Sequence, residues 1–343
     1  MWSLLTLAAA GLAIRSYIGK LSAIGHRGSR SRHFDGKRFQ NAVPTPDKSV
    51  LDLLRWGATS SHPRWEWREV IDQPPPPRRV SSGEIRITFV NHSTVLVQTD
   101  GLNILTDPIW SRRTSPFSWV GPARFHRPGI PFETLPPIDV VLVSHNHYDH
   151  LDLPTLRRLA RDHSPRIFTG LGNRQFLQDR QVSGSTEMDW HQRIQLTEDT
   201  SLICVPAQHW STRTRTDLRT TLWCGFILLS PKGNVYFAGD TGFGPHFEEI
   251  SKRYGPFRLA LLPIGSYLPR WFMRSNHISP DEAVSAHRML RASISVAIHF
   301  GTFKLGDERQ DQAVQDLRLA TFDDPALQQS IWVLAPGEGR AVP

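Results

Sequence analysis

The sequence predicts one large α/β body with more than one sheet layer. Short apolar runs of strand length alternate with helical stretches over about 260 residues. Apolar side chains make up 39% of the 343 residues, which is enough for a core and argues against wholesale disorder. Gly and Pro are spread without a fixed period, and we find no internal repeat. These observations favour a layered α/β architecture.

The strand-like runs fall into an early and a late group. Residues 84–90 and 93–98 alternate as two paired strands do, and residues 103–106 continue the same sheet. Residues 139–144, DVVLVS, form a continuous apolar run between polar residues, which suits a strand buried on both faces. The late group lies at residues 201–205, 221–229, 234–238, 259–263 and 294–298.

Two helical stretches lie between these strands, at residues 153–161 and 280–291. The second stretch has a clear start signal. Ser279 stands at the N-cap, Pro280 takes the first helical position, and Glu282 follows three residues after the cap. This is a capping box with the favoured proline, so we expect a helix that begins at residue 280.

The first 40 residues differ from the rest in composition. Residues 2–14 are apolar apart from Ser3 and Thr6, a run shorter than the ~20 residues that a spanning helix needs. Seven basic residues and one acidic residue lie within residues 1–40. We predict an uncleaved membrane anchor, interfacial or inserted, whose basic flank holds to anionic lipid. A helix packed on the body, or a start-site artefact, is the alternative.

A connector and the main domain follow this predicted anchor in the sequence. Residues 41–80 are rich in Trp and Pro and are predicted to form an irregular connector to a main domain at residues 81–343. We expect the protein to be membrane-associated. If the anchor inserts, the positive-inside rule places the main domain in the cytoplasm.

Charge and cysteine content exclude several classes of protein. The formal net charge is +8, and most of it lies in residues 1–40. The body is therefore nearly neutral, which gives little support to a nucleic-acid-binding surface. Two cysteines, Cys204 and Cys224, are too few for a disulfide framework or a cysteine-rich zinc module. We expect two buried thiols, with one disulfide between them as the alternative.

Three histidines and a carboxylate follow the DVVLVS run directly. His145, His147, Asp149 and His150 fall within six residues. Imidazole and carboxylate groups are metal ligands, and a loop lets closely spaced side chains converge. In an extended stretch the first two histidines point the same way and can share one metal ion. A turn at Tyr148 would direct the last two ligands toward a second ion.

Three further candidates stand at the ends of later strand-like runs: His209, Asp240 and His299. Each alone is a weak signal, because a single histidine after a strand is commonly structural. Asp240 can bridge two ions, since a carboxylate has two oxygens, and Gly239 allows close backbone approach beside it. The predicted ligands are His145, His147 and His209 on one ion, Asp149, His150 and His299 on the other, and Asp240 between them.

With these residues in place, the sequence resembles the metallo-β-lactamase superfamily. The H-x-H-x-D-H motif at 145–150 and the later His, Asp and His carry the resemblance. It is closest to the N-acylphosphatidylethanolamine-hydrolysing phospholipase D branch and runs from about residue 84 to about residue 303. The matching stretches lie at residues 91–95, 105–109, 121–124, 135–139, 144–152, 238–242, 269–273, 277–284 and 298–302.

The resemblance implies a fold, a cofactor and an activity. The fold is an αββα sandwich with two zinc ions on loops at one edge of the catalytic domain. The reaction is phospholipase D-type hydrolysis of N-acylphosphatidylethanolamine to N-acylethanolamine and phosphatidic acid, in which a hydroxide between the two ions attacks phosphorus. The partners are a phospholipid and a membrane surface, without nucleic acid, and a homodimer is left open.

Predicted catalytic residues are His277, Asp149 and Asp240. His277 is a candidate to give a proton to the leaving alkoxide or to contact the phosphate, and a structural or capping role is equally open. Asp107 is expected to orient a metal-bound histidine through the second ring nitrogen, with a turn-forming role as its alternative.

Arg270 and Tyr148 are the predicted substrate contacts. Arg270 stands beside Trp271 and Phe272, so it could hold a phosphate while the apolar side chains meet acyl chains. Packing in the core is the alternative for these aromatic residues and for Tyr148. His92 could be an outer partner of the site and is given no ligand role.

Two other functions stay open. A lactonase, or another ester or amide hydrolase, would keep the metals and cleave a different bond. A non-catalytic membrane adaptor would use a degenerate fold, although the complete set of seven ligands argues against it. Metal content would separate the adaptor from the enzymes, because a degenerate fold need not bind two ions.

Overall fold

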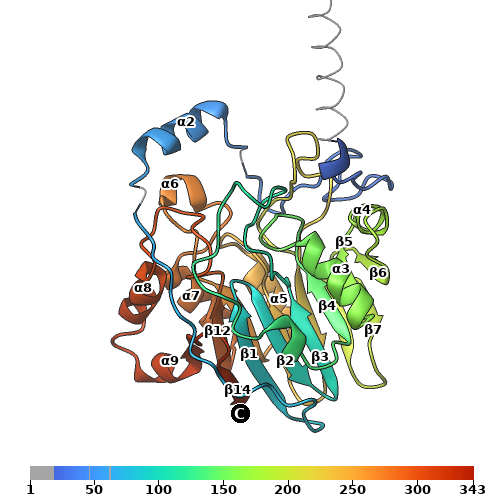
Figure 1. The fold of residues 1–343 in the computed structure, drawn as a ribbon, viewed down its shortest axis with the longest axis vertical. Coiled ribbons are helices and arrows are strands. Elements are labelled where there is room, and N and C mark those ends of the chain that lie inside the picture. The colour runs from blue at the N-terminus through green and yellow to red at the C-terminus, as the bar shows by residue number, and fades with distance from the viewer. Residues whose placement is uncertain (1–18, 46, 62) are drawn as a thin grey trace, which may run out of the picture.

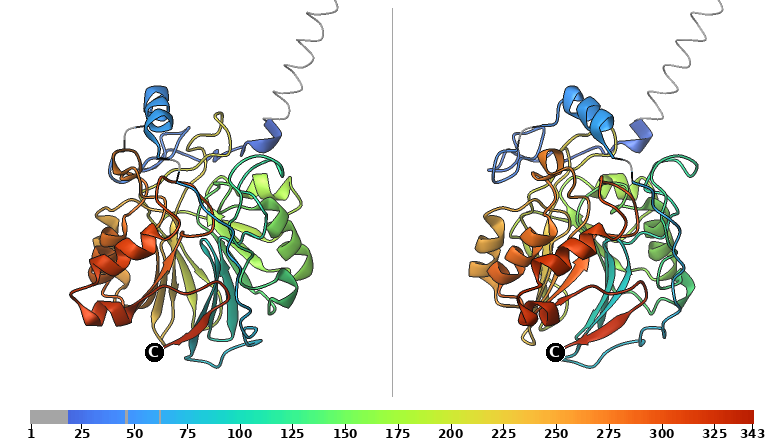
Figure 2. Two further views of the ribbon diagram at one scale, coloured as in Figure 1. Left: turned by 60° about the vertical axis from the view of Figure 1, so that its left-hand side comes forward. Right: turned by 90° about the vertical axis from the view of Figure 1, so that its left-hand side faces the viewer.

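The computed structural model describes residues 19–45, 47–61 and 63–343. Two seven-stranded sheets pack face to face, and helices cover the outer face of each sheet (Figures 1 and 2). This arrangement confirms the predicted αββα sandwich. The C-terminal residues lie at one end of the sandwich, while helix α2 and residues 19–45 lie at the opposite end.

The first sheet combines an antiparallel meander with a parallel half. Its strand order is β14-β1-β2-β3-β4-β5-β6, antiparallel from β14 to β3 and parallel from β3 to β6. The meander contains the first three early strands expected from the sequence, and the fourth, β4, belongs to the parallel half. The bounds are β1 Ile85–Asn91, β2 Thr94–Thr99, β3 Leu102–Thr106, β4 Val140–Val143, β5 Arg166–Gly170, β6 Ser185–Met188 and β14 Gly339–Val342.

The second sheet has the order β13-β12-β11-β10-β9-β8-β7, antiparallel from β7 to β10 and parallel from β10 to β13. All the late strand-like runs of the sequence belong to it, although the run at 221–229 becomes a strand only from Gly225. The bounds are β7 Arg193–Gln195, β8 Ser201–Val205, β9 Gly225–Leu229, β10 Asn234–Phe237, β11 Phe257–Pro263, β12 Ile294–Ile298 and β13 Ile331–Trp332.

Helices complete the two outer layers. Leu156 of α3 and Phe176 of α4 pack on the first sheet. Phe247 of α5, Val284 of α7 and Leu317 of α8 pack on the second. The bounds are α2 Val50–Thr59, α3 Leu153–Asp162, α4 Arg174–Gln178, α5 His246–Tyr254, α6 Arg270–Met273, α7 Pro280–Leu290, α8 Gln312–Ala320 and α9 Pro325–Ser330, with a 3₁₀ turn at Phe132–Thr134.

Strand β4 shows how the sheets position the next loop. Val140 and Leu142 face the core between the sheets, while Val141 and Val143 face the core under α3. Because both faces are covered, the sequence shows a continuous apolar run instead of alternation. The strand therefore delivers the residues from Ser144 onward to the edge of a fully buried sheet.

Helix α7 begins at Pro280, as predicted. The Ser279 N–H donates to the Glu282 carboxylate at 3.0 Å, which is half of the capping box. The helix ends at Leu290, where Arg291 takes a left-handed conformation with φ 52. This firm start matters below, because Glu282 also contacts a residue beside the functional site.

Helix α2, Val50–Thr59, lies within the region predicted to be irregular, so that expectation is wrong for these ten residues. A capping box starts the helix: the Asp52 N–H donates to Ser49 Oγ at 3.1 Å and the Ser49 N–H to Asp52 Oδ2 at 2.8 Å. No residue of α2 is buried. Leu51 is 76% exposed and Leu54 is 64% exposed, so the helix presents apolar side chains to solvent.

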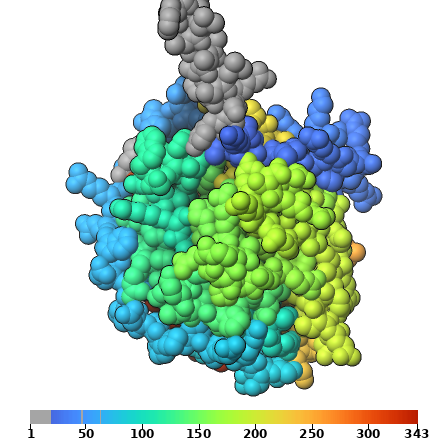
Figure 3. Space-filling view, turned by 45° about the vertical axis from the view of Figure 1, so that its right-hand side comes forward, coloured from blue at the N-terminus to red at the C-terminus, as the bar shows by residue number. Residues whose placement is uncertain are grey.

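Residues 19–45, which we call the N-terminal strap, pack on the body. Phe34 and Phe39 are buried together with Trp223, and Figure 3 shows the strap spread over one end of the molecule. The predicted anchor at residues 2–14 lies outside the described residues. Among the residues that the structure describes, no helix is long and apolar enough to cross a membrane.

Both cysteines are buried thiols without a disulfide, as expected. Cys204 lies in β8, and Cys224 directly precedes β9. Burial raises the pKa of the Cys204 thiol, which keeps it protonated and unreactive.

Candidate metal centre

Four loops bring the predicted ligands together at one edge of the sandwich, and a fifth adds another histidine. The loop after β4 supplies residues 145–150, and the turn between β1 and β2 adds His92. The loops after β8, β10 and β12 supply His209, Asp240 and His299. All seven predicted ligands lie in this cluster, so the structure places together residues that are far apart in the sequence.

His145, His147 and His209 form the first ligand group. Nε2 of His145 lies 2.8 Å from Nδ1 of His147, and Nε2 of His209 lies 3.3 Å from the same atom. One nitrogen of each ring lies within 4.8 Å of the others, a spacing that can hold one ion. His209 Nδ1 donates to the carbonyl oxygen of Asn276 at 2.9 Å, which leaves the Nε2 lone pair facing the cluster.

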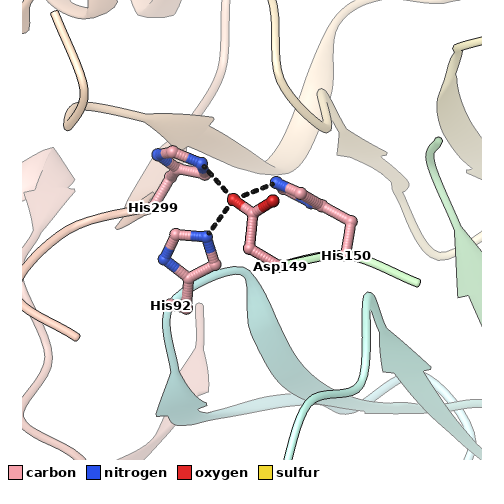
Figure 4. A group of neighbouring side chains, drawn as sticks. All are labelled: His92, Asp149, His150 and His299. Carbon is pink, nitrogen blue, oxygen red and sulfur yellow. Dashed lines mark hydrogen bonds and ion pairs between the residues drawn. The ribbon is translucent and has the colours of Figure 1, made fainter. Parts of the chain in front are cut away.

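Asp149, His150 and His299 form the second ligand group (Figure 4). Oδ2 of Asp149 lies 3.2 Å from His150 Nε2 and 3.4 Å from His299 Nε2. His92 adds a further ring, with its Nε2 3.0 Å from the same oxygen. In Figure 4 the three rings surround the carboxylate from three sides.

Asp240 lies between the two groups. Its Oδ2 is 3.2 Å from His150 Nε2 and 3.0 Å from His299 Nε2 in the second group. The same oxygen is 3.8 Å from His209 Nε2 in the first group. Gly239 has φ 62, and a Cβ there would lie 2.7 Å from the Cβ of Ser144, so only glycine fits at this close approach. This is the position expected of a bridging carboxylate.

Asp107 contacts His150 from the side opposite the cluster. Its Oδ2 accepts a hydrogen bond from His150 Nδ1 at 2.6 Å. The Ser144 N–H donates to Oδ1 at 2.7 Å, and the Ser144 hydroxyl donates to Oδ2 at 2.6 Å. Because this contact keeps a proton on Nδ1 of His150, Nε2 is the nitrogen that would bind a metal ion. This is the contact that the sequence predicted for Asp107.

Several buried polar atoms of the cluster make no hydrogen bond to any described residue. They are His147 Nε2, His150 Nε2, His299 Nε2, His277 Nδ1 and Asp240 Oδ1. Buried polar atoms are normally satisfied, so this concentration needs a missing partner. Imidazole and carboxylate together suit a divalent transition metal. The residues therefore fit a metal centre.

The electrostatics of the cluster also favour a cation. Burial acts to raise the pKa of Asp240, but His150 and His299 hold it well below its usual range. Burial lowers the pKa of His147 to about 4, so this ring is neutral. Burial also acts to lower the pKa of His299, but Asp240 and Asp149 raise it to about 9. The two carboxylates thus stabilise positive charge in a buried site.

His277 lies beside the cluster, where Arg270 holds it. Its Nδ1 is 3.8 Å from Asp240 Oδ2, and burial lowers the pKa of the ring to about 4. Arg270 donates to the His277 carbonyl oxygen at 2.9 Å and to Glu282 Oε2 at 2.7 Å. Arg270 therefore links the start of α7 to the backbone of His277. Its role as a substrate contact stays a prediction.

Tyr148 packs against a buried arginine. The Arg213 guanidinium lies 3.9 Å from the centre of the Tyr148 ring. Arg213 Nη1 also donates to the carbonyl oxygens of Asn146 and Leu151, each at 3.0 Å. The arginine thus ties together the loop that carries the H-x-H-x-D-H motif. A substrate contact by Tyr148 stays a prediction.

Three residues of the cluster have strained backbones. His92, Asp107 and His299 have φ values of 46, 33 and 61, in the left-handed region that such residues rarely adopt. Strain of this kind gathers at functional sites, where surrounding contacts enforce it. One such contact is Gly265, where a Cβ would lie 2.0 Å from the His299 carbonyl oxygen.

Sequence reasoning left His92 outside the ligand set, yet the structure places it against Asp149. The sequence did contain a signal for this position of His92. It lies in a polar turn between two paired strands, and the turn of such a hairpin lies at the edge of the sheet. His287 of α7 lies outside the cluster and has a structural contact, with its Nδ1 2.8 Å from Ser295 Oγ.

The fold and the clustered donors are those of a metal-dependent hydrolase. A model of the β-lactamase superfamily domain matches residues 102–300, and the chain belongs to this superfamily. N-acyl-phosphatidylethanolamine-hydrolyzing phospholipase D 1 of Caenorhabditis elegans is 37% identical over 287 residues, which cover 79% of this chain and 80% of the worm protein. The mitochondrial protein of the same activity name in Saccharomyces cerevisiae is 34% identical over 228 residues, which cover 64% of this chain and 48% of the yeast protein. A solved metallo hydrolase of Ignicoccus hospitalis covers 75% of this chain and 98% of its own with a TM-score of 0.55 at 23% identity, which agrees with the fold.

Proposed function

We propose that the protein is a zinc-dependent, phospholipase D-type phosphodiesterase. Its substrate would be N-acylphosphatidylethanolamine, and its products N-acylethanolamine and phosphatidic acid. The observation that carries the proposal is the pair of ligand groups that share Asp240. Two zinc ions bound there would supply Lewis acidity and a hydroxide nucleophile at neutral pH. The names of the worm and yeast relatives support the choice of substrate.

The chain's own residues supply orientation and a proton. Asp107 fixes which nitrogen of His150 faces the site, and Asp240 joins the two groups. His277 is a neutral, buried ring whose Nδ1 lies 3.8 Å from Asp240 Oδ2. We propose that its N–H donates to the phosphate oxygens or to the leaving alkoxide. Arg270, itself bound to Glu282, fixes the backbone carbonyl of His277.

Exposed apolar side chains near the site support a lipid substrate. Leu51 and Leu54 of α2 are exposed, and Trp271 of α6 is 40% exposed. Helices α2 and α6 meet through stacked aromatic rings whose centres lie 4.8 Å apart. Helix α6 also contains Arg270, which holds His277. Helix α2 therefore packs on the helix whose Arg270 contacts the backbone of His277.

We propose that this end of the protein lies on a membrane, with residues 2–14 as the anchor and the body on the cytoplasmic side. Basic side chains near an anionic surface contribute about 1 kcal/mol each. The exposed basic residues of the strap are Lys20, Arg27, Arg30, Arg32, Lys37 and Arg38. A homodimer stays a prediction, which light scattering of the purified protein would test.

The substrate can be tested directly. Purified protein of known metal content is incubated with vesicles that contain N-acylphosphatidylethanolamine, and the products are identified by mass spectrometry. We expect phosphatidic acid and N-acylethanolamine in equal amounts. The His147→Ala variant should form neither product, while His191→Ala, an exposed histidine outside the cluster, should match the wild type.

A panel of lactones and carboxylic esters is run in parallel. If metal-loaded protein hydrolyses a lactone or ester and does not hydrolyse the phospholipid, the proposed substrate is wrong. The protein would then be a metal-dependent hydrolase of carboxylic esters or lactones. Protein that turns over neither class and binds no metal would support the adaptor.

A further inference from the structure

We infer that Asn41 of the N-terminal strap is a positioning residue for the metal ligand His209, which makes the strap part of the metal centre. The inference rests on the proposed function, because it takes His209 as a ligand. His209 lies 62 residues from His147 in the sequence. Its position therefore depends on the surroundings of its own loop rather than on the H-x-H-x-D-H motif.

The Asn41 amide binds both backbone groups of His209. Asn41 Oδ1 accepts a hydrogen bond from the His209 N–H at 3.1 Å, and Asn41 Nδ2 donates to the His209 carbonyl oxygen at 2.9 Å. A neighbouring antiparallel strand bonds the N–H and C=O of one residue in the same way. One side chain of the strap thus fixes the peptide groups on both sides of the ligand.

Trp223 determines which way round the Asn41 amide lies. The Trp223 indole N–H donates to Asn41 Oδ1 at 2.8 Å. Because an indole nitrogen only donates, the oxygen of the amide must face it, and the amide nitrogen is left for the His209 carbonyl. Trp223 is 1% exposed and packs with Phe34 and Phe39 of the strap. The orientation of the amide is therefore enforced by buried aromatic packing.

The strap also forms hydrogen bonds with Gln208, the residue before His209. Gln208 Nε2 donates to the Val43 carbonyl oxygen at 3.0 Å and to Thr45 Oγ1 at 2.6 Å. The Gln208 N–H donates to Thr241 Oγ1 at 2.9 Å, directly beside Asp240. The strap, the loop that carries His209 and the loop that carries Asp240 therefore form one hydrogen-bonded unit.

Three contacts outside the cluster define where the His209 ring lies. Asn41 fixes the backbone N–H and C=O of His209, and the Asn276 carbonyl oxygen fixes Nδ1 of the His209 ring. Removing an outer partner of a ligand weakens metal binding by roughly 10–100-fold. We therefore expect Asn41→Ala to weaken one bound ion by about 10–100-fold. The other ion, on Asp149, His150 and His299, should keep its affinity.

The test measures metal binding by the full chain without relying on activity. Zn²⁺ affinities are determined by competition with a chromogenic chelator, and the visible absorption of the Co²⁺ form reports ligand geometry. Gln40→Ala is the matched control, because Gln40 is the exposed neighbour whose amide lies 3.5 Å from Asp35 Oδ2. Asn41→Asp keeps an acceptor for the His209 N–H but places a second oxygen against the His209 carbonyl oxygen, so we expect it to weaken the same ion.

Selective weakening of one ion in Asn41→Ala, a changed cobalt spectrum and wild-type behaviour of Gln40→Ala would support the inference. Two unchanged affinities would overturn it, and so would equal weakening of both ions, which is the mark of a general folding defect. If Asn41→Ala does not fold, Asn41→Asp decides by the same criteria. Wild-type protein that binds no Zn²⁺ would instead overturn the proposed function and this inference with it.

Discussion

Replacing Asp107 with Asn is expected to weaken metal binding at the proposed site formed by Asp149, His150 and His299. The Asp107 carboxylate accepts from His150 Nδ1 at 2.6 Å and from the Ser144 N–H at 2.7 Å. An amide of the same shape can still accept from Ser144, but its nitrogen then faces the N–H of His150. Two donors cannot share a hydrogen bond, so the His150 proton must move to Nε2. That nitrogen is the one that faces Asp149 and Asp240.

The size of the effect follows from the burial of the pair. Both side chains are 0% exposed, so water cannot replace the lost contact. Loss of a histidine's outer partner weakens a metal by about 10–100-fold, or roughly 1.4–2.7 kcal/mol. The burial places the expected loss near the upper end of this range. Loss of the charge-assisted bond should also lower the free energy of unfolding by roughly 1.5–3 kcal/mol.

The assay counts ions per chain after dialysis against a series of buffered Zn²⁺ concentrations. Asp162→Asn on α3 is the control, because it changes an exposed carboxylate by the same chemistry. Asp107→Asn should load its second ion only at Zn²⁺ concentrations about 10–100-fold higher than wild type needs. Equal loading curves for Asp107→Asn and wild type would refute the argument that Asp107 sets the His150 tautomer.

Three other changes test the membrane surface, the packing of the site and a buried histidine. Changing Leu51 and Leu54 together to Asp should reduce cosedimentation with anionic vesicles and leave hydrolysis of a soluble phosphodiester intact; unchanged vesicle binding would contradict the surface role. Gly265→Ala should lower the melting temperature, because its Cβ would lie 2.0 Å from the His299 carbonyl oxygen, and an unchanged melting temperature would disprove that contact. Burial lowers the pKa of His246 from 6.5 to about 3, so the stability from its neutral ring is present above pH 6.5 and is lost as the pH falls toward 3. The free energy of unfolding is measured in urea on chelator-treated protein at pH 7.5 and pH 5.5. The fall in this free energy between the two pH values should be smaller in His246→Gln than in wild type by roughly 1 kcal/mol. An equal fall in the two proteins would count against this assignment.

The sequence predicted the parts of the site that depend on local order. The DVVLVS run has apolar residues on both faces because β4 lies between two cores, and its end delivers the H-x-H-x-D-H motif to the edge. The residues that follow β8, β10 and β12 meet this motif because their strands end at the same edge. Asp107 could be placed because it directly follows β3, which is the neighbour of β4.

The contacts that the sequence did not reveal depend on packing between distant segments. His92 lies 57 residues before Asp149, and only the sheet topology brings them together. Asn41 lies 168 residues before His209, in a segment with no recognisable motif. Helix α2 could have been found, because Ser49 and Asp52 have the spacing of a capping box before an apolar run. The Trp- and Pro-rich composition of residues 41–80 led instead to the prediction of an irregular connector.

Strand β14 affects how the first sheet is completed on the ribosome. It pairs with β1, which is synthesised about 250 residues earlier, or roughly 10–50 s before β14 at ordinary translation rates. During that interval the free edge of β1 carries unpaired N–H and C=O groups that can bind the strands of other chains. Arg258 then joins β14 to the second sheet's β11 by donating to the Val342 carbonyl oxygen at 2.9 Å. The late synthesis of β14 therefore leaves this edge of the first sheet unpaired until nearly the whole chain has been made.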